Sequence, residues 1–304
     1  MLSPCTITMY DSLFCSDMKR LSFLLAVFVL CPTFTFAQFE YRSNWRSLPP
    51  TFKPYISKLM TPGGINIVRD APPDHAHHHG LMFAFIVDGV NFWEEYNPKE
   101  YGRQETTTIA ETRDNGKQKM ESALTWSDGV GQTLILEKRT ITATQINGAT
   151  VLDWASTFTL PPGRDKAVLG GNDYHGLGMR FVESMDSGKY ITPADAGKKE
   201  GRLIPCRWIA YASKAGDHPV SLVLYDTKDN PRPMLAFAMG GEVKEEFGYL
   251  SATTNLFREQ ITLTSEKPIT FRYILVLWDG DKTAKEIEDF AVQNLGLGTG
   301  SLTR

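Results

Sequence analysis

Cysteine is scarce in this sequence of 304 residues, which contains only four. Three of them, Cys5, Cys15 and Cys31, lie within the first 37 residues, so Cys206 stands alone in the rest of the chain. A single thiol excludes an internal disulfide there, and stability must come from a packed core instead. Cys206 lies in a run typical of a strand, and we interpret it as a buried side chain rather than a nucleophile.

The sequence also lacks an excess of basic residues and, after residue 37, a long apolar run. Its 32 Lys and Arg face 35 Asp and Glu, which gives a formal net charge of −3. Nucleic-acid-binding domains are usually basic, so no nucleic-acid partner is predicted. A helix that crosses a bilayer needs about 20 apolar residues, so no membrane span is predicted after residue 37.

The first 37 residues have the pattern of a leader. Met18-Lys19-Arg20 precede an apolar run over residues 21–30, and small residues follow at Thr35 and Ala37. This order predicts a signal peptide that begins at Met18 and is cleaved near Ala37-Gln38. We therefore expect a leader over residues 1–37 and a periplasmic or secreted protein over residues 38–304.

Short apolar runs separated by turn signals occupy most of residues 38–304. Alternating apolar residues predict strands, and Asp88-Gly89 and Asn147-Gly148 are typical of tight hairpins. One helix, capped by Asp281, is predicted over residues 281–294. We predict an all-β fold, a single large antiparallel β-sandwich with one C-terminal helix; the alternative is a second β domain after Pro161-Pro162-Gly163. The expected strands cover residues 55–60, 65–68, 81–87, 90–93, 105–111, 117–126, 132–143, 150–160, 177–181, 202–211, 220–225, 234–239, 260–264 and 269–278.

Four of the six histidines lie within five positions, between Asp74 and Gly80. Pro72 and Pro73 precede them, and proline favours extended backbone before it. Side chains alternate in an extended chain. We therefore expect one side of this segment to carry His75, His77 and His79, and the other to carry His78.

A second polar group is predicted in the glycine-rich stretch over residues 170–181. Leu177, Met179 and Phe181 share one face of the expected strand, which leaves Arg180 on the other face. His175 lies in the turn that enters this strand. We expect His175 and Arg180 to face the histidine segment.

Several stretches resemble the exported bacterial family labelled PmoA-like, or methane oxygenase PmoA. They are residues 74–81, 87–93, 176–181, 230–233 and 268–273, and together they span nearly all of the chain after the leader. The usual form of the first stretch in that family is Asp-His-Pro-His-His-Arg-Gly. This chain has Ala76 in place of the proline and His79 in place of the arginine.

The resemblance implies a fold similar to the large β-sandwiches of the galactose-mutarotase type and an association with sugar breakdown. The expected partner is therefore a carbohydrate or another small molecule. The family label also implies a metal-dependent oxygenase, which is the third alternative for function. Since fold does not determine activity, the function must be argued from the site.

Three interpretations of the histidine segment stay open. A divalent metal, zinc, iron or copper, would take His75 and His77 as ligands, with His175 or a carboxylate as the third. In acid–base chemistry on a sugar, His77 or His78 would exchange protons and Glu105 or Glu94 would be the partner. In a structural role, the imidazoles would hydrogen-bond the backbone of a turn.

The prediction for function is an exported protein of carbohydrate metabolism, with an enzyme of lyase, hydrolase or epimerase type favoured. The alternative is a carbohydrate-binding or accessory protein without turnover. The candidate catalytic residues are His75, His77, His78 and Glu105. The candidate substrate-binding residues are Asp74, Trp93, His175 and Arg180.

Overall fold

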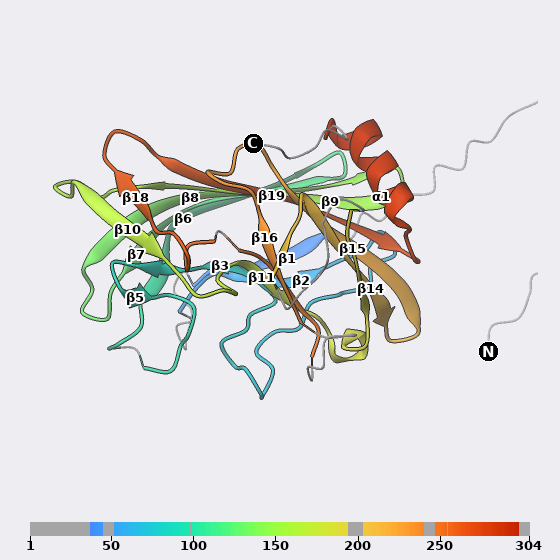
Figure 1. Cartoon of the computed structure of the whole chain (residues 1–304), viewed down its shortest axis with the longest axis horizontal. Coiled ribbons are helices and arrows are strands. Elements are labelled where there is room, and N and C mark those ends of the chain that lie inside the picture. Colours follow the sequence, from blue (N-terminus) through green and yellow to red (C-terminus); the bar gives the residue numbers. More distant parts are fainter. Residues whose placement is uncertain are drawn as a thin grey trace, which may run out of the picture. The chain divides into compact units, whose positions relative to one another are not determined.

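The computed structural model describes residues 37–44, 52–97, 99–193, 203–239, 247–253 and 255–297. All of these residues belong to one compact unit, Thr35–Arg304. Its strands pair antiparallel in three sheets (Figure 1).

The largest sheet has eight strands. The long strands β6 to β9 follow one another in the chain and lie next to one another at one edge of this sheet. From edge to edge the eight strands are β12 (Lys189–Ile191), β14 (Trp208–Ala215), β15 (His218–Asp226), β19 (Ile269–Asp279), β9 (Ala149–Thr159), β8 (Thr133–Ile146), β7 (Lys117–Ser127) and β6 (Arg103–Asp114). The hairpin between β8 and β9 turns at Asn147 and Gly148, which both have positive φ. The turn predicted from this Asn-Gly pair is confirmed.

The second sheet has seven strands and the third has four. The seven are β1 (Phe39–Arg42), β2 (Tyr55–Leu59), β3 (Leu81–Ala84), β11 (Gly176–Arg180), β17 (Tyr249–Thr253), β16 (Leu235–Met239) and β13 (Leu203–Pro205). The four are β18 (Ile261–Thr264), β10 (Lys166–Gly170), β4 (Ile86–Val87) and β5 (Val90–Asn91). A short 3₁₀ turn, η1 (Glu183–Met185), follows β11.

Alternation along β19 shows how the sheets pack. Phe271, Tyr273 and Leu275 enter the main core, which also contains side chains of the seven-stranded sheet such as Phe83 and Leu177. The intervening Ile274, Val276 and Trp278 face a smaller apolar cluster beneath the C-terminal helix. The predicted all-β sandwich with a C-terminal helix is therefore confirmed, with both faces of this strand buried.

The helix lies against the outer face of the eight-stranded sheet (Figure 1). α1 spans Ala284–Phe290 and continues into a π-helical turn, η2 (Ala291–Leu295). The predicted cap, Asp281, is wrong: the hydroxyl of Thr283 accepts from the Glu286 N–H, and the Glu286 carboxylate accepts from the Thr283 N–H. This reciprocal pair satisfies two backbone donors that a helix start otherwise leaves free.

Several strand predictions need correction. The segment predicted at residues 65–68 makes only isolated bridges, because the Asn66 side chain bonds the backbone of Leu59 and Val68 in place of a ladder. The run at 81–87 divides at Phe85 between two sheets. The run at 202–211 divides at Cys206, which is buried as predicted, and Arg202 lies outside the described residues. Strands β1, β10, β12 and β17 were not predicted.

The histidine segment is folded into turns, so the predicted alternation is wrong. The Pro72 carbonyl accepts from the His75 N–H at 3.0 Å, and the His75 carbonyl accepts from the His78 N–H at 2.9 Å. Pro73 thus occupies the second position of the first turn, which its fixed φ favours. Two successive turns bring the side chains of His75 and His78 to the same side.

Gly80 ends this segment with φ of +40°, and a Cβ added there would lie 2.0 Å from the Ile56 carbonyl oxygen. We expect Gly80→Ala to lower the free energy of unfolding by more than about 2 kcal/mol, because strained backbone and a backbone clash act together. Urea unfolding would measure the loss. The control is Gly89→Ala, at φ of +84° with nothing within 4 Å, where we expect about 1 kcal/mol from backbone conformation alone. Equal losses of free energy of unfolding in Gly80→Ala and Gly89→Ala would contradict a clash between the added Cβ and the Ile56 carbonyl oxygen.

Candidate functional site

Three of the predicted histidines line a cavity of about 280 Å³. The other lining residues come from the loop after β5 and from β16, β17 and the turn before β11. The full lining is His75, His77, His78, Glu94, Tyr96, Tyr174, Phe237, Met239, Phe247 and Tyr249. The cavity therefore joins segments far apart in the sequence, and aromatic rings form most of its wall.

The three imidazoles contact one another. The ring of His78 stacks on His75 at 4.7 Å between centroids and meets His77 edge-on at 4.6 Å. On its other side it stacks on Tyr249 at 5.4 Å. His75, His77 and His78 thus form one cluster, whereas the sequence pattern placed His78 apart from the other two.

Two of these imidazoles are neutral near pH 7. Burial, together with nearby cations, lowers the pKa of His77 to about 4 and that of His78 to about 2. In both rings Nδ1 is buried without a hydrogen-bond partner. The Nε2 side is therefore the one that a molecule in the cavity can reach.

His75 is held differently, through a shared carboxylate. Its Nδ1 lies 3.0 Å from Asp74 Oδ2, and the same oxygen accepts from Arg180 Nη2 at 2.8 Å. Burial alone would raise the pKa of Asp74, but the bonds from His75 and Arg180 outweigh it and lower the pKa to about 2. Asp74 therefore stays ionised and orients the His75 ring, as in a carboxylate–imidazole pair.

Arg180 lies behind the cavity wall. Its side chain is 3% exposed, and the centre of its guanidinium lies 3.5 Å from the centroid of the Phe247 ring, which lines the cavity. Its Nε and Nη1 atoms are buried without partners. The prediction that Arg180 faces the histidine segment agrees with this position, because its bond to Asp74 anchors that segment.

The fourth histidine of the segment belongs to a separate buried network. His79 Nδ1 lies 2.8 Å from Asp70 and its Nε2 lies 3.0 Å from Glu95, while its ring stacks on Tyr55. Burial would lower the pKa of His79, but the two carboxylates raise it above the ordinary value. His79 is therefore a buried cation that joins two loops.

Lys53 extends this network from the other side. Its ammonium is fully buried, forms an ion pair with Glu95 and donates to the Trp93 carbonyl at 2.7 Å. The Tyr55 hydroxyl donates to the second oxygen of Asp70 at 2.8 Å. No sequence signal marked Lys53 or Tyr55 as part of the site, because both precede the histidine motif and lie in ordinary strand-like surroundings.

Trp93 and His175 stack on each other at 5.1 Å and are almost completely buried. Trp93, a candidate substrate-binding residue, is part of the core and is not among the residues that line the cavity. Burial lowers the pKa of His175 to about 3, and neither of its ring nitrogens has a partner.

Of the two candidate carboxylates, the structure places Glu94 and not Glu105 at the cavity. Glu105 is exposed on β6 and is not among the residues that line the cavity, so its predicted catalytic role is wrong. Its neighbours Gln104 and Thr106 point into the protein, and alternation turns Glu105 outward. Glu94, the alternative partner, lines the cavity and accepts from the Tyr174 hydroxyl at 2.9 Å.

A metal does not fit the residues as they lie. Within the described ranges, no three His, Cys, Asp or Glu side chains come together in an arrangement that would hold a metal ion. His75 and His77 are neighbours, but His175 packs against Trp93. We therefore derive no chemistry through a metal, and the divalent metal stays a prediction from the sequence.

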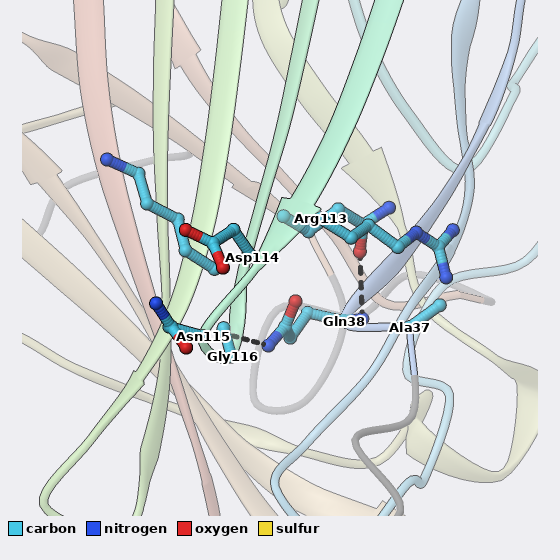
Figure 2. Close-up of a pocket in the computed structure, with 8 residues that line it drawn as sticks. Ala37, Gln38, Arg113, Asp114, Asn115 and Gly116 are labelled. Atoms are coloured by element: carbon cyan, nitrogen blue, oxygen red, sulfur yellow. Dashed lines mark hydrogen bonds between the residues drawn. The ribbon is translucent and has the colours of Figure 1, made fainter.

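A smaller hollow of about 140 Å³ lies at the turn between β6 and β7 (Figure 2). There Gln38 donates from its backbone to Gln118 at 3.0 Å and from its side chain to the Gly116 carbonyl at 2.8 Å. Arg113 and Asp114 also line it, but no histidine or aromatic ring does. A larger cavity of about 430 Å³ includes Trp208, Tyr225 and Arg272 in its lining but no histidine. The cavity that gathers the imidazoles is therefore the candidate functional site.

Fold and site together define an all-β sandwich protein with a cavity lined by aromatic rings and three imidazoles. In the described part of the chain, no helix is both long and apolar enough to cross a membrane. Residues 29–291 match the model of a family of unknown function, DUF6807, and the chain belongs to that family. No curated protein matches it.

Solved structures with local similarity include glycoside hydrolases of family GH36. The α-galactosidase AgaB of Geobacillus stearothermophilus is 14% identical, with 66% of this chain and 30% of that chain covered and a TM-score of 0.41. The galactosidase domain of the α-galactosidase–sucrose kinase AgaSK is 11% identical, with 65% and 30% covered and a TM-score of 0.36. A TPR-domain-containing protein of Parabacteroides distasonis is 7% identical, with 77% and 46% covered and a TM-score of 0.36. The chain thus spans about a third of the length of the α-galactosidase that it matches.

The lowered histidine pKa values predict a dependence of stability on pH. His77, His78 and His175 are neutral in the folded protein down to about pH 4, whereas in the unfolded chain they gain protons below about pH 6.5. The unfolded state binds more protons in this window, so the free energy of unfolding falls as the pH falls from 6.5 to 4. His79 acts in the opposite direction: because its folded pKa is raised, it adds stability as the pH falls towards 6.5, and this gain is complete once the unfolded imidazole is protonated below that pH, so it offsets the fall only at the top of the window. Urea unfolding at several pH values measures the effect.

His175→Phe is the control for this pH dependence, because the aromatic ring can still stack on Trp93 while one titrating group is removed. We expect a shallower fall than in the parent protein. A free energy of unfolding that stays constant between pH 6.5 and 4 would contradict the assignment of neutral buried imidazoles.

The His79 network predicts a large loss from a single substitution. His79→Gln removes a buried cation from between two carboxylates, and we expect the free energy of unfolding to fall by about 3 kcal/mol. His79→Arg should recover part of this loss, because a guanidinium can donate to both carboxylates. Thermal and urea unfolding measure both changes. His218→Gln, at an exposed position of β15, is the matched control, and a loss no larger than in this control would rule out a stabilising network.

Proposed function

We propose that this chain is an exported protein that binds a carbohydrate in the histidine cavity and transfers a proton to or from it. One observation carries the proposal: aromatic rings and a cluster of imidazoles line one cavity, and one of the imidazoles is oriented by an ionised carboxylate. The resemblance to the PmoA-like family supports the sugar, and the predicted leader supports export. Both remain parts of the proposal.

The aromatic wall is suited to a sugar ring. Tyr174, Phe237, Phe247 and Tyr249 line the cavity, and Tyr96 lies at its exposed rim. A pyranose presents apolar C–H groups on its faces, which pack on aromatic rings, and hydroxyls around its edge, which need hydrogen-bond partners. The Nε2 atoms of His77 and His78 and the Tyr174 hydroxyl are placed to serve as such partners.

His75 is the group best placed to exchange a proton. Asp74 holds its Nδ1, which leaves Nε2 for the substrate, and Arg180 holds Asp74 from behind. A base oriented by a third group is the arrangement that proton-transferring enzymes use. This assignment differs from the sequence-based hypothesis, in which His77 or His78 acted with Glu105.

The number of carboxylates that line the cavity limits the type of reaction that the site can catalyse. Hydrolysis of a glycoside usually needs two carboxyl groups on opposite sides of the scissile bond. Glu94 is the only carboxylate among the described residues that line the cavity. Epimerase-type chemistry, in which His75 removes a proton from the carbon beside the carbonyl of an open-chain sugar and returns it, therefore fits the site better than hydrolysis by a carboxylate pair.

The test is to incubate the protein, prepared without a histidine tag, with a panel of neutral reducing monosaccharides in D₂O, because their open-chain form has an acidic C–H beside the carbonyl. We expect incorporation of deuterium at a sugar carbon, or a new product, by NMR and mass spectrometry. His75→Gln should slow this by at least about 100-fold with binding retained, because it removes the proton-transferring group. His218→Gln, which changes a histidine outside the cavity, should leave the rate unchanged.

Two other outcomes are informative. Binding of a sugar by the parent protein without deuterium incorporation or product would favour the accessory protein without turnover. If no sugar in the panel binds, the carbohydrate function is wrong.

A further inference from the structure

The cations closest to the cavity are already paired with carboxylates. Arg180 binds Asp74, Lys53 binds Glu95, and His79 lies between Asp70 and Glu95. None of these three cations is among the residues that line the cavity. A ligand in the cavity therefore meets no Lys or Arg side chain among the described residues that line it, and the nearest imidazole with a charged partner, His75, is already paired with Asp74.

One carboxylate does line the cavity, and its position is fixed. Glu94 accepts from the Tyr174 hydroxyl through Oε1 and from the Asn91 side-chain amide through Oε2. Asn91 is itself held, because its side-chain oxygen accepts from the Trp93 N–H at 2.7 Å. These contacts keep the negative charge of Glu94 at the cavity wall.

We infer that the site selects neutral sugars against acidic ones, and that Glu94 is the residue that sets this specificity. The inference rests on the proposed carbohydrate function and deepens it by naming the charge class of the ligand. The ligands that bind weakly are uronic acids and other sugars with a carboxylate. The ligands that are accepted are neutral sugars with the same ring geometry.

The physical reason is like-charge repulsion in a partly desolvated space. A ligand carboxylate would lose water on entering the cavity, and this cost is offset only if a cation or several donors replace the water. No free cation is present in the described lining, and Glu94 repels the ligand at short range, where the effective dielectric constant is well below that of water. His77 and His78 are neutral near pH 7 and do not compensate for this charge.

The experiment compares matched sugars that differ only at carbon 6. Methyl glucoside is paired with methyl glucuronate and methyl galactoside with methyl galacturonate, and dissociation constants are measured by calorimetry at pH 7 and fixed salt. We expect each acidic sugar to bind at least tenfold more weakly than its neutral partner. Glu94→Gln keeps an acceptor for Tyr174 and removes the charge, so it should reduce this ratio to less than threefold.

Glu100→Gln is the control, because Glu100 is exposed and does not line the cavity. It should leave the ratio unchanged. An acidic sugar that binds as tightly as its neutral partner would overturn the inference, and so would a ratio that Glu94→Gln leaves unaltered. If neither member of either pair binds, the carbohydrate function fails and the inference fails with it.

Discussion

The buried imidazolium of His79 between Asp70 and Glu95 is the contact on which the site depends. It ties the loop that carries His75, His77 and His78 to the loop that carries Glu94 and Tyr96. Isolated carboxylates in such a position would be costly, and so would an isolated lysine at Lys53. Because each charge has a partner, the network can remain buried and hold the two loops at a fixed separation.

Charge is distributed around the cavity in two layers. The deeper layer contains the paired ions, and the inner wall contains neutral imidazoles, aromatic rings and Glu94. The paired cations contribute to the low pKa of His77 and His78 without entering the cavity. One histidine-rich motif therefore supplies three different kinds of group: a buried cation, neutral hydrogen-bonding rings, and a ring oriented by Asp74.

The fold class and the segment that carries the candidate site could be predicted from the sequence, because alternation, turn pairs and a histidine cluster are local signals. The sequence did not predict which side chains meet. Periodicity assumed an extended chain at residues 72–79, and two turns grouped the rings differently. Choosing between Glu94 and Glu105 required knowing which face of β6 is outward. Phe237 and Tyr249 reach the cavity from the paired strands β16 and β17, and Phe247 from just before β17, all far along the chain from the histidines, and no local pattern reports such proximity.

The two halves of the cavity have separate origins in the chain. Its three histidines, Glu94 and Tyr96 come from residues 75–96, while Phe237 and Met239 come from β16, Tyr249 from β17 and Phe247 from just before β17. Because Tyr249 stacks on His78, substitutions in β17 would disturb the imidazole cluster, whereas substitutions at Phe237 or Met239 would change the lining alone. Within the family, divergence confined to β16 would therefore alter the shape of the cavity and leave its histidine cluster unchanged.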